Sequence, residues 1–392
     1  MCPSAVIRAR LAPVSRPAQD PPSLGGAPIE DLCDDLVAQK LQIDAELGRG
    51  GMGRVLRAKD VDLNRDVALK VLAGQSDPSR FMAEAQITGQ LDHPNVIPVH
   101  EFGVSATGEP FFTMKLVRGH KSLREVIELL RAGDPAAHAE FSFERRAQIV
   151  QRVCDALEYA HKRGVIHRDV KPDNVLVGPH GEVYVVDWGV AKVVEGAAAP
   201  KDEPRGDVEQ AVQTLGTRSD VTRDGASVGT LLYMPPEQAL GKREQVGPWS
   251  DLYSLTAVLY ELLSLHHYLE DVEAETPFDL LYAIVSHPPK LAERHYDRRN
   301  GRVPRSLSNL CKRGLSKRPS ERWGSAAELR EAIQGWLEGR APVVCPGTLL
   351  QRILAQGIKA IDRFPVLLPL LAVIGLAVFV SLQITLLWRA LR

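Results

Sequence analysis

Cysteine is scarce in this sequence, and its cysteines are not paired along the chain. The five cysteines lie far apart and none forms a C-x-x-C spacing: Cys2, Cys33, Cys154, Cys311 and Cys345. This distribution argues against both a zinc site and a disulfide framework. We therefore expect the bulk of the chain to occupy a reducing compartment.

An excess of charge of one sign is also lacking. Lys and Arg number 48 against 49 Asp and Glu, which gives a formal net charge of -1. The sequence has no global basic field, so nucleic acid is not an expected partner.

The N-terminal region lacks an apolar run long enough for a secretory signal. Residues 1–28 hold six prolines and are predicted to form a disordered arm. From Pro28 the apolar residues recur at helical spacing over 29–37, which predicts a short amphipathic helix. Within 1–40 this helix is interpreted as a brace packed on the following domain, and a partner-binding helix is the alternative.

Formal charge is absent from one long stretch near the C-terminus. Residues 364–388 are 25 consecutive positions without a charged side chain, rich in Leu, Val, Ile and Ala. About 20 apolar residues suffice for a helix to cross the hydrocarbon core of a bilayer. We expect a transmembrane helix at 364–388, with a basic juxtamembrane linker at 338–363 before it and a short tail at 389–392 after it. The alternative is a buried core helix.

The middle of the chain contains a dense group of polar residues. The stretch 167–174 reads His-Arg-Asp-Val-Lys-Pro-Asp-Asn, and Asp187-Trp188-Gly189 follows thirteen residues after Asn174. A carboxylate and an amide at this spacing, beside a second carboxylate, can hold a nucleophile's proton and hard cations together. Such oxygen ligands suit Mg²⁺, so the pattern indicates a phosphoryl-transfer site.

A glycine-dense turn precedes this site. Gly48, Gly50 and Gly53 lie between two predicted strands in 41–58, and they leave backbone amides free to approach phosphates. The motif is weak alone, but the chain continues as strand rather than helix, which disfavours a dinucleotide fold. A further strand, 67–72, carries Lys70 among apolar neighbours. Burial of a lysine without a partner costs free energy, so we expect Lys70 to pair with Glu84 in the helical run 80–87.

Taken in order, these motifs resemble those of the eukaryotic-type protein kinases, of the Ser/Thr kind found widely in bacteria. The resemblance covers about residues 41–337. It implies an α+β, two-lobed fold with a small β-rich lobe and a large helical lobe, to which the sequence adds one transmembrane helix. A chain of 392 residues is long enough for such a domain with extensions.

The resemblance also implies roles for individual residues. Asp169 would accept the proton of a protein hydroxyl, Lys171 would steady the moving phosphoryl group, and Lys70 with Glu84 would place the phosphates of ATP. Asn174 and Asp187 would hold Mg²⁺ or Mn²⁺. The remaining nucleotide contacts would come from Gly48, Gly50, Gly53, Val55, Ala68, Met114 and Leu116. Lys115 stands where kinases often carry an acid, and we expect no effect on chemistry from this departure.

Three further features are expected to support the site. A helix over 143–163 should end at Gly164 and lead to the catalytic loop. The resemblance implies that Asp251, which opens a helix over 256–265, anchors that loop. Glu237 and Arg322 should form a buried pair.

The segment after Asp187 is predicted to be a phosphorylation-controlled switch. Residues 195–225 are polar and rich in Gly, Ala and Pro, as in mobile loops. Arg168, helped by Lys192, would bind a phosphate that orders the segment. Thr222 best matches the usual position, Thr217 and Ser227 come next, and an unmodified, constitutively ordered loop is the alternative.

Trp188 replaces the phenylalanine that most kinases carry in the metal-binding triplet. We expect its larger ring to compensate for the small Thr88 nearby, because core substitutions that conserve volume are tolerated best. Unrelated substitutions at the two positions are the alternative.

The resulting interpretation is a single-pass inner-membrane Ser/Thr kinase with a cytoplasmic catalytic domain. Its expected partners are ATP, protein substrates, membrane lipid through 364–388, and a transient homodimer for trans-autophosphorylation. An ATP-binding pseudokinase scaffold is the alternative. Such proteins usually lack one of the five residues needed for the chemistry, and all five are present here: Lys70, Glu84, Asp169, Asn174 and Asp187.

Overall fold

The computed structural model describes residues 40–49, 53–72, 77–105, 108–189, 191–193, 231–242, 244–272 and 276–340. The chain divides into two compact units, residues 1–78 with 103–111, and residues 79–102 with 112–392. The predicted helix at 29–37, the linker beyond Arg340 and the uncharged run 364–388 lie outside the described residues. No helix within the described ranges is long and apolar enough to cross a membrane.

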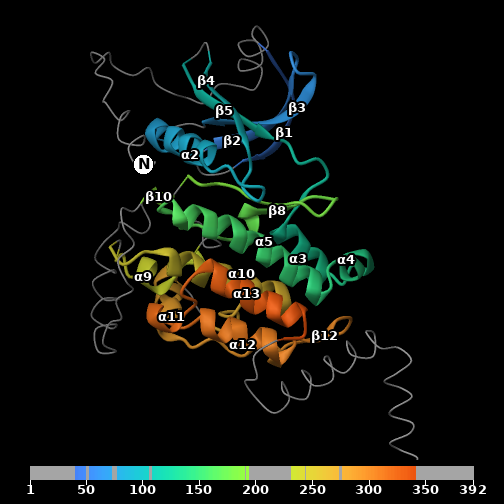
Figure 1. The fold of residues 1–392 in the computed structure, drawn as a ribbon, viewed down its shortest axis with the longest axis vertical. Coiled ribbons are helices and arrows are strands. Elements are labelled where there is room, and N and C mark those ends of the chain that lie inside the picture. The colour runs from blue at the N-terminus through green and yellow to red at the C-terminus, as the bar shows by residue number, and fades with distance from the viewer. Residues whose placement is uncertain are drawn as a thin grey trace, which may run out of the picture. The chain divides into compact units, whose positions relative to one another are not determined.

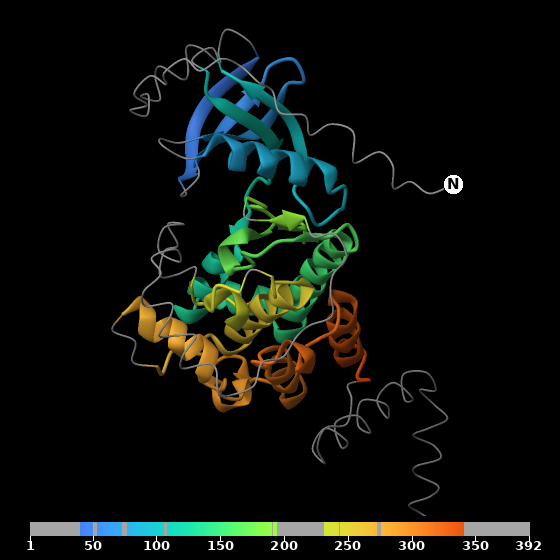
Figure 2. The ribbon, with the colours of Figure 1, turned by 90° about the vertical axis from the view of Figure 1, so that its left-hand side faces the viewer.

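The first unit is built from antiparallel strands. β1 (Leu41–Arg49), β2 (Gly53–Asp60) and β3 (Arg65–Leu72) pair in sequence order, and they begin a five-stranded sheet of order β1-β2-β3-β5-β4. The strongly twisted β1–β3 strands are visible in Figure 2. One face packs into a small core of Leu41, Leu56, Ala58, Val67, Leu69 and Val71, with Phe111 against it.

β4 (Val99–Val104) and β5 (Pro110–Lys115) complete the sheet order, and α2 (Pro78–Gln90) follows β3 in the chain. The predicted helical run 80–87 is therefore confirmed. Phe81, Glu84, Ala85 and Thr88 form the buried side of α2.

The second unit is mainly helical (Figure 1). Its further helices are α3 (Leu123–Arg131), α4 (Pro135–Glu140), α5 (Phe143–Lys162), α9 (Pro236–Ala239), α10 (Pro248–Ser264), α11 (Pro277–Ser286), α12 (Arg305–Gly314) and α13 (Ala326–Leu337). Three 3₁₀ turns lie between them: η2 (Pro172–Asn174), η4 (Ala292–Arg294) and η5 (Pro319–Glu321).

Short strands connect these helices. β6 (Lys121–Ser122), β8 (Val175–Val177) and β9 (Val183–Val185) form a three-stranded sheet. β7 (Val165–Ile166) pairs with β10 (Lys192–Val193), and β11 (Tyr296–Asp297) pairs with β12 (Gly301–Arg302).

Helix α5 has clear start and stop signals. The Ser142 hydroxyl accepts a hydrogen bond from the Arg145 backbone N–H, which satisfies one of the free donors at the helix start. Gly164 follows the last turn with φ +73°, a conformation that glycine adopts without strain. Both ends of the predicted helix at 143–163 are thus confirmed to within one residue.

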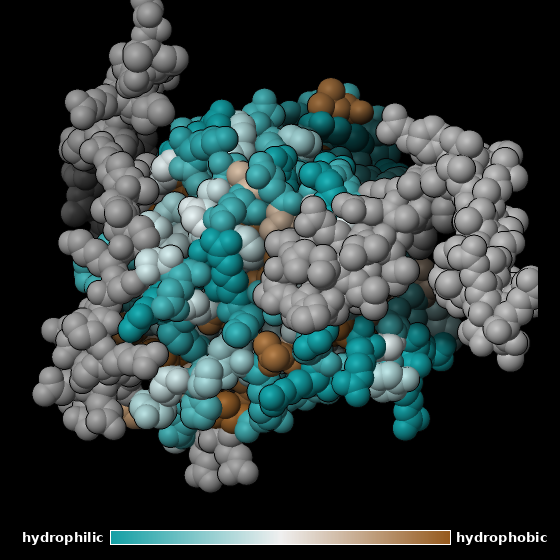
Figure 3. Space-filling view, turned by 60° about the horizontal axis from the view of Figure 1, so that its bottom comes forward, coloured by the Kyte–Doolittle hydropathy of each residue, from teal (hydrophilic) through white to brown (hydrophobic). Residues whose placement is uncertain are grey.

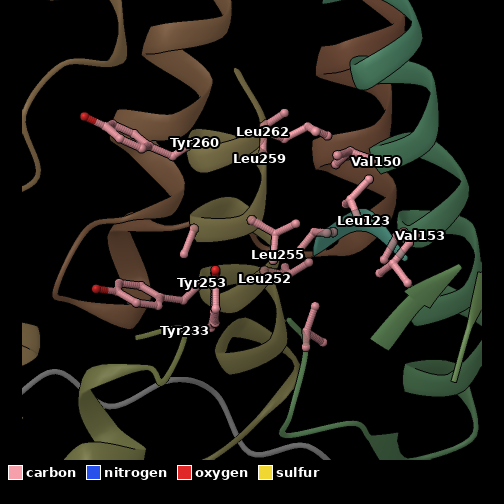
Figure 4. Packing of buried hydrophobic residues seen from close by; sticks show 14 of the residues in the cluster. Leu123, Val150, Val153, Tyr233, Leu252, Tyr253, Leu255, Leu259, Tyr260 and Leu262 are labelled. Carbon is pink, nitrogen blue, oxygen red and sulfur yellow. The ribbon is translucent and has the colours of Figure 1, made fainter. Parts of the chain in front are cut away.

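Helix α10 is the centre of the larger core, and its predicted start was wrong. It begins at Pro248, eight residues before the expected start at Thr256, and every residue from Ser250 to Ser264 is buried. Proline is tolerated in the first turn because the N–H that it lacks has no partner there. In Figure 4, Leu259 and Leu262 of α10 face Val150 of α5, while Tyr253 and Tyr260 point to the opposite side.

Candidate active site

The loop that carries Asp169 is anchored by a buried carboxylate from α10. Asp251 Oδ2 accepts the His167 backbone N–H and Oδ1 accepts the Arg168 backbone N–H, each at 2.8 Å. The His161 ring donates from Nε2 to the same carboxylate at 2.8 Å. The expected anchoring of the loop by Asp251 is confirmed.

Electrostatics keep the anchor ionised. Burial alone would raise the pKa of Asp251, but the hydrogen bond and charge of His161, the nearby His167 and the Arg168 backbone N–H together lower it below its usual range. An ionised carboxylate can accept at both oxygens, so it holds two consecutive backbone amides of the loop at once.

Asp169 is held by two neighbours on the same loop. Lys171 Nζ lies 2.8 Å from Asp169 Oδ2. The Asn174 side-chain amide donates to the Asp169 backbone oxygen at 2.8 Å and to its Oδ2 at 3.1 Å. Burial raises the pKa of Asp169, and the charge of Lys171 opposes that rise. A carboxylate with a raised pKa is a better proton acceptor than an exposed one.

The two proposed metal ligands follow neighbouring strand ends. β8 and β9 pair with Val175 opposite Val185, and one step further the Val186 N–H donates to the Asn174 backbone oxygen at 3.0 Å. Asn174 and Asp187 are thereby brought to one edge of this small sheet. Asp187 and Arg168 have φ angles of +63° and +67°, which lie in the left-handed region. Non-glycine residues rarely adopt this backbone conformation, and where they do it is often at functional sites.

The donor set at this edge fits a hard divalent cation. The Asn174 amide nitrogen is engaged by Asp169, so its amide oxygen remains to ligate, together with the Asp187 carboxylate. Oxygen ligands few in number, completed by phosphate and water, are what Mg²⁺ uses.

Trp188 is completely buried beside the catalytic loop. Its ring lies 4.5 Å from that of His167 between centroids, and His167 Nε2 donates to the Val186 carbonyl at 3.1 Å. Trp188 therefore packs directly against His167 of the catalytic loop. Thr88 is buried and its hydroxyl donates to the Glu84 carbonyl at 2.7 Å. The proposed compensation between Trp188 and Thr88 stays a prediction.

The last residue of β5, Lys115, makes a contact that sequence reasoning missed. Lys115 Nζ donates to the Tyr184 hydroxyl and lies 4.7 Å from the centre of its ring, while the Lys115 backbone N–H donates to the Pro98 carbonyl at 3.0 Å. Met114 packs in the same cluster, formed by Ile97, Val117, Tyr184, Leu176 and Val186. The unusual lysine was visible in the sequence, but its partner lies 69 positions away.

A second missed group lies on the helical face beside the catalytic loop. Glu261 of α10 is buried and accepts from Arg124 at 3.1 Å, from Arg131 at 2.9 Å and from the Tyr233 hydroxyl. The signal was available, because Glu261 is the single charged residue in the apolar run 252–265 and a buried charge needs partners.

The expected pair of Glu237 and Arg322 is present. Arg322 binds the Glu237 carboxylate through two nitrogens, each at 2.9 Å, with both side chains buried. Such two-point pairs fix orientation as well as charge.

Three predicted nucleotide glycines and strand residues, Gly48, Gly53 and Val55, lie in the first unit with Lys70. Gly48 and Lys70 are both opposite Val55, and Gly53 is opposite Leu72. A Cβ on Gly53 would stand 2.3 Å from the Val71 carbonyl oxygen, so this position accepts only glycine without rearrangement.

Several predicted pairs and residues have no test in the geometry. Lys70 belongs to the first unit and Glu84 to the second, and their pairing stays a prediction. Ala68 is buried in β3, and Leu116 follows Lys115. The backbone of Lys192 pairs with Ile166, while Gly50, Thr217, Thr222 and Ser227 lie outside the described residues.

Comparison with known proteins decides the family. The profile of the protein kinase domain matches residues 41–334. The chain belongs to the protein kinase family. This match agrees with the predicted β-rich and helical parts of a kinase fold and spans both units.

Bacterial Ser/Thr kinases are among the relatives. The chain is 32% identical over 317 residues to serine/threonine-protein kinase PknD of Protochlamydia amoebophila, covering 79% of this chain and 31% of that protein. It is 33% identical over 321 residues to PknB of Mycolicibacterium smegmatis, covering 78% and 44%. It is 32% identical over 308 residues to pkn3 of Myxococcus xanthus, covering 76% and 50%. The matched part of this kinase-family chain thus spans half or less of each relative's length.

Proposed function

We propose that the protein is an ATP-dependent protein serine/threonine kinase. The observation that carries the proposal is the catalytic loop, in which the partly buried Asp169 is contacted by Lys171 and Asn174 and held in place through Asp251. Membership of the protein kinase family and the names of the bacterial relatives support it.

In the proposed reaction, an oxygen of a protein serine or threonine attacks the γ-phosphorus of ATP in line with the leaving ADP. Asp169 orients the hydroxyl and accepts its proton, and Lys171 offsets charge on the moving phosphoryl group. Asn174 and Asp187 would hold Mg²⁺, which when bound offsets the charge of the phosphates. Lys70, paired with Glu84, would position the phosphates, and the glycine-rich turn and connector would hold the nucleotide.

The test is the replacement of the proposed proton acceptor in the full-length protein. Asp169→Asn should lower Mg-dependent phosphorylation of a protein substrate by about 10²–10⁴-fold, with an unchanged circular dichroism spectrum. The matched control Asp92→Asn changes an exposed turn residue of the same type and should keep activity. If Asp169→Asn were as active as the unmodified protein, the role assigned to Asp169 would be refuted. If the unmodified protein were inactive with both Mg²⁺ and Mn²⁺, the pseudokinase scaffold would be favoured instead.

We further propose that phosphorylation between Asp187 and Glu237 activates the kinase, through transfer between two copies of the chain. Support comes from Arg168, which directly precedes Asp169 and whose backbone is held from both sides: its N–H binds Asp251 and its carbonyl accepts from Gln238 at 3.3 Å. A phosphate bound by Arg168 would therefore act next to the catalytic carboxylate.

The proposed switch has its own test. Replacing Thr222 by Ala should lower the activity of the autophosphorylated protein several-fold, with Thr217→Ala and Ser227→Ala as the next candidates, and phosphatase treatment should have the same effect. If the triple alanine variant and the phosphatase-treated protein both kept full activity, the loop would be constitutively ordered instead.

Membrane anchoring is part of the same proposal. The uncharged run 364–388 and the basic residues Arg352, Lys359 and Arg363 before it favour a single span with the catalytic domain in the cytoplasm, where ATP is found.

A further inference from the structure

Positive charge is concentrated in one segment of the helical unit. Residues 294–318 contain nine Lys and Arg and one carboxylate, Asp297, although the whole chain has a formal net charge of -1. Of the exposed cations in this segment, Arg305, Arg313 and Arg318 pair with nearby glutamates. Five others have no ion pair with a described carboxylate and together form what we call the basic surface: Arg294, Arg298, Arg299, Arg302 and Lys312.

The β11–β12 hairpin at the centre of the basic surface is firmly attached to the core. Asp297 Oδ1 accepts the backbone N–H groups of Arg299 and Asn300, each at 2.6 Å. The Asn300 side-chain oxygen points inward and accepts from Arg146 of α5 at 2.9 Å. Arg146 is fully buried and also donates to the carbonyls of Phe141 and Leu262. The hairpin is therefore a rigid platform rather than a loose loop.

The outer side of the hairpin combines an aromatic ring with arginines. Tyr296 is 63% exposed and stands directly opposite Arg302 in the strand pairing, while Arg298 and Arg299 occupy the connecting turn. An exposed aromatic residue beside cations is typical of side chains that lie at a membrane–water interface.

The described surface that is visible at the lower end of the helical unit is mostly hydrophilic (Figure 3). In Figure 1, β12 and α12 both lie toward the lower end of the helical unit. Figure 3 looks toward this end and shows mainly hydrophilic side chains with small, separate hydrophobic areas among the described residues. A hydrophobic protein partner would bury a larger apolar patch, so the surface fits a charged partner better.

We propose that the basic surface docks on a lipid bilayer that contains anionic headgroups. This inference rests on the proposed membrane anchor. Helix α13 ends at Leu337, and the 23 residues 341–363 separate the last described residue from the uncharged run. A segment of that length spans at most about 75–85 Å even when fully extended, so an anchored domain would remain within that distance of the headgroups.

Charge agrees with this placement. The cytoplasmic leaflet is negatively charged and attracts basic segments within about one Debye length. The linker itself adds Arg352, Lys359 and Arg363 against Asp362, so the linker and the basic surface carry the same sign. Docking would fix the orientation of the catalytic domain toward substrates that lie at the membrane.

The test uses the full-length protein in nanodiscs of zwitterionic lipid and in matched discs with roughly 30% anionic lipid. The readout is amide hydrogen exchange over 296–302. Exchange should slow by at least about threefold on the anionic discs only, and high salt should remove the difference because it screens the charges.

Charge-reversal variants supply the control. Arg298→Glu, Arg299→Glu and Arg302→Glu together should abolish the slowing. The control variant reverses three exposed cations on α5 and α13: Arg152, Lys162 and Arg330. It changes the net charge by the same amount and should leave the slowing of exchange intact. Both variants should phosphorylate a soluble substrate normally. If the first variant does not fold, the milder Arg298→Gln with Arg299→Gln replaces it and should weaken the slowing.

The outcomes separate the surface from the anchor. A protein that stays in the discs after an alkaline wash but shows equal exchange in both lipids would overturn the docking surface and leave the anchor standing. If the alkaline wash removes the protein from the discs, the proposed anchor is wrong. The docking surface is then tested by sedimentation with free vesicles, and no preference for anionic vesicles would overturn the docking surface as well. Equal slowing by added duplex DNA would point to a general polyanion site and would also overturn the proposal.

Discussion

At the scale of single residues, the catalytic carboxylate is subject to two opposing influences. Burial raises the pKa of Asp169, whereas the ammonium group of Lys171 at 2.8 Å lowers it. The base works only when it is unprotonated, so the pKa sets the acidic limit of activity.

Replacing Lys171 by Met should therefore shift the acidic limb of the kcat/KM profile to higher pH, besides lowering activity. With the lysine gone, the effect of burial on the pKa of Asp169 is opposed less strongly, and the carboxylate holds its proton to a higher pH. A full pH profile of the variant measures the shift. Lys121→Met, which removes an exposed lysine of β6, should leave the limb in place, and a shift of the Lys171 variant to lower pH would contradict this reasoning.

The contact between Lys115 and Tyr184 should influence nucleotide affinity. Because the pair fixes the end of β5, where Met114 lies and which Leu116 follows, Lys115→Met should raise the KM for ATP about 3- to 10-fold and change kcat by less than about twofold. Tyr184→Phe keeps the ring under the ammonium group and removes only the hydroxyl, so its effect should be smaller. Steady-state kinetics with varied ATP separates the two constants, and a loss confined to kcat would exclude a role in positioning the connector.

These residues show what the sequence could and could not predict. Asp169, Lys171 and Asn174 lie within six positions of one another, so their contacts follow from local geometry and the motif reveals them. Lys115 and Tyr184 are 69 positions apart, and only folding brings them together. Asp187 lies between these cases, because the β8–β9 pairing was needed to place it beside Asn174.

At the scale of elements, buried polar groups from α10 and the turns around it fix the larger core. Asp251 lies in the first turn of α10 and reaches the catalytic loop, while Glu237 of α9 meets Arg322 after η5. Sequence reasoning identified both anchors but began α10 too late, because Pro248 was not recognised as a helix start. The nearly continuous apolar run predicted the middle of the helix, and the residues at Gly247 and Pro248 decided its start.

The buried pair gives a stability prediction. Arg322→Met should destabilise the folded state by about 3–5 kcal/mol, because Glu237 would stay buried without a counter-charge. The double variant with Glu237→Met should lose less than the single one, since no charge then remains buried. Denaturant unfolding measures both. The matched control Arg318→Met breaks only an exposed pair with Glu321 and should cost no more than about 1 kcal/mol; equal losses in the two single variants would argue against a role for burial.

At the scale of the whole molecule, the residues predicted to bind the nucleotide and those predicted to carry the chemistry are divided between the two units. Gly53, Val55 and Lys70 belong to the first unit, and Asp169 with Asp187 belongs to the second. Each part was predicted from its own motif, and the pairing of Lys70 with Glu84 remains a prediction because it joins the two.

The proposed anchor has a topological consequence. With the catalytic domain inside the cell and one span at 364–388, a tag placed after Arg392 should lie outside. Protease added to intact cells should remove that tag and leave the catalytic domain intact. The same tag placed before Met1 is the control and should be protected, and protection of both tags would point to a segment that does not cross the membrane.

The left-handed backbone at Arg168 and Asp187 also bears on how this chain can evolve. A non-glycine residue in such a conformation costs of the order of 1–3 kcal/mol, and glycine at either position would relieve that strain while removing the side chain that the proposed chemistry needs. Selection for folding stability alone would therefore favour loss of these two side chains. Asp187→Gly should therefore raise the midpoint of thermal unfolding while it lowers the proposed activity, and this pair of changes would reveal a trade-off between activity and stability.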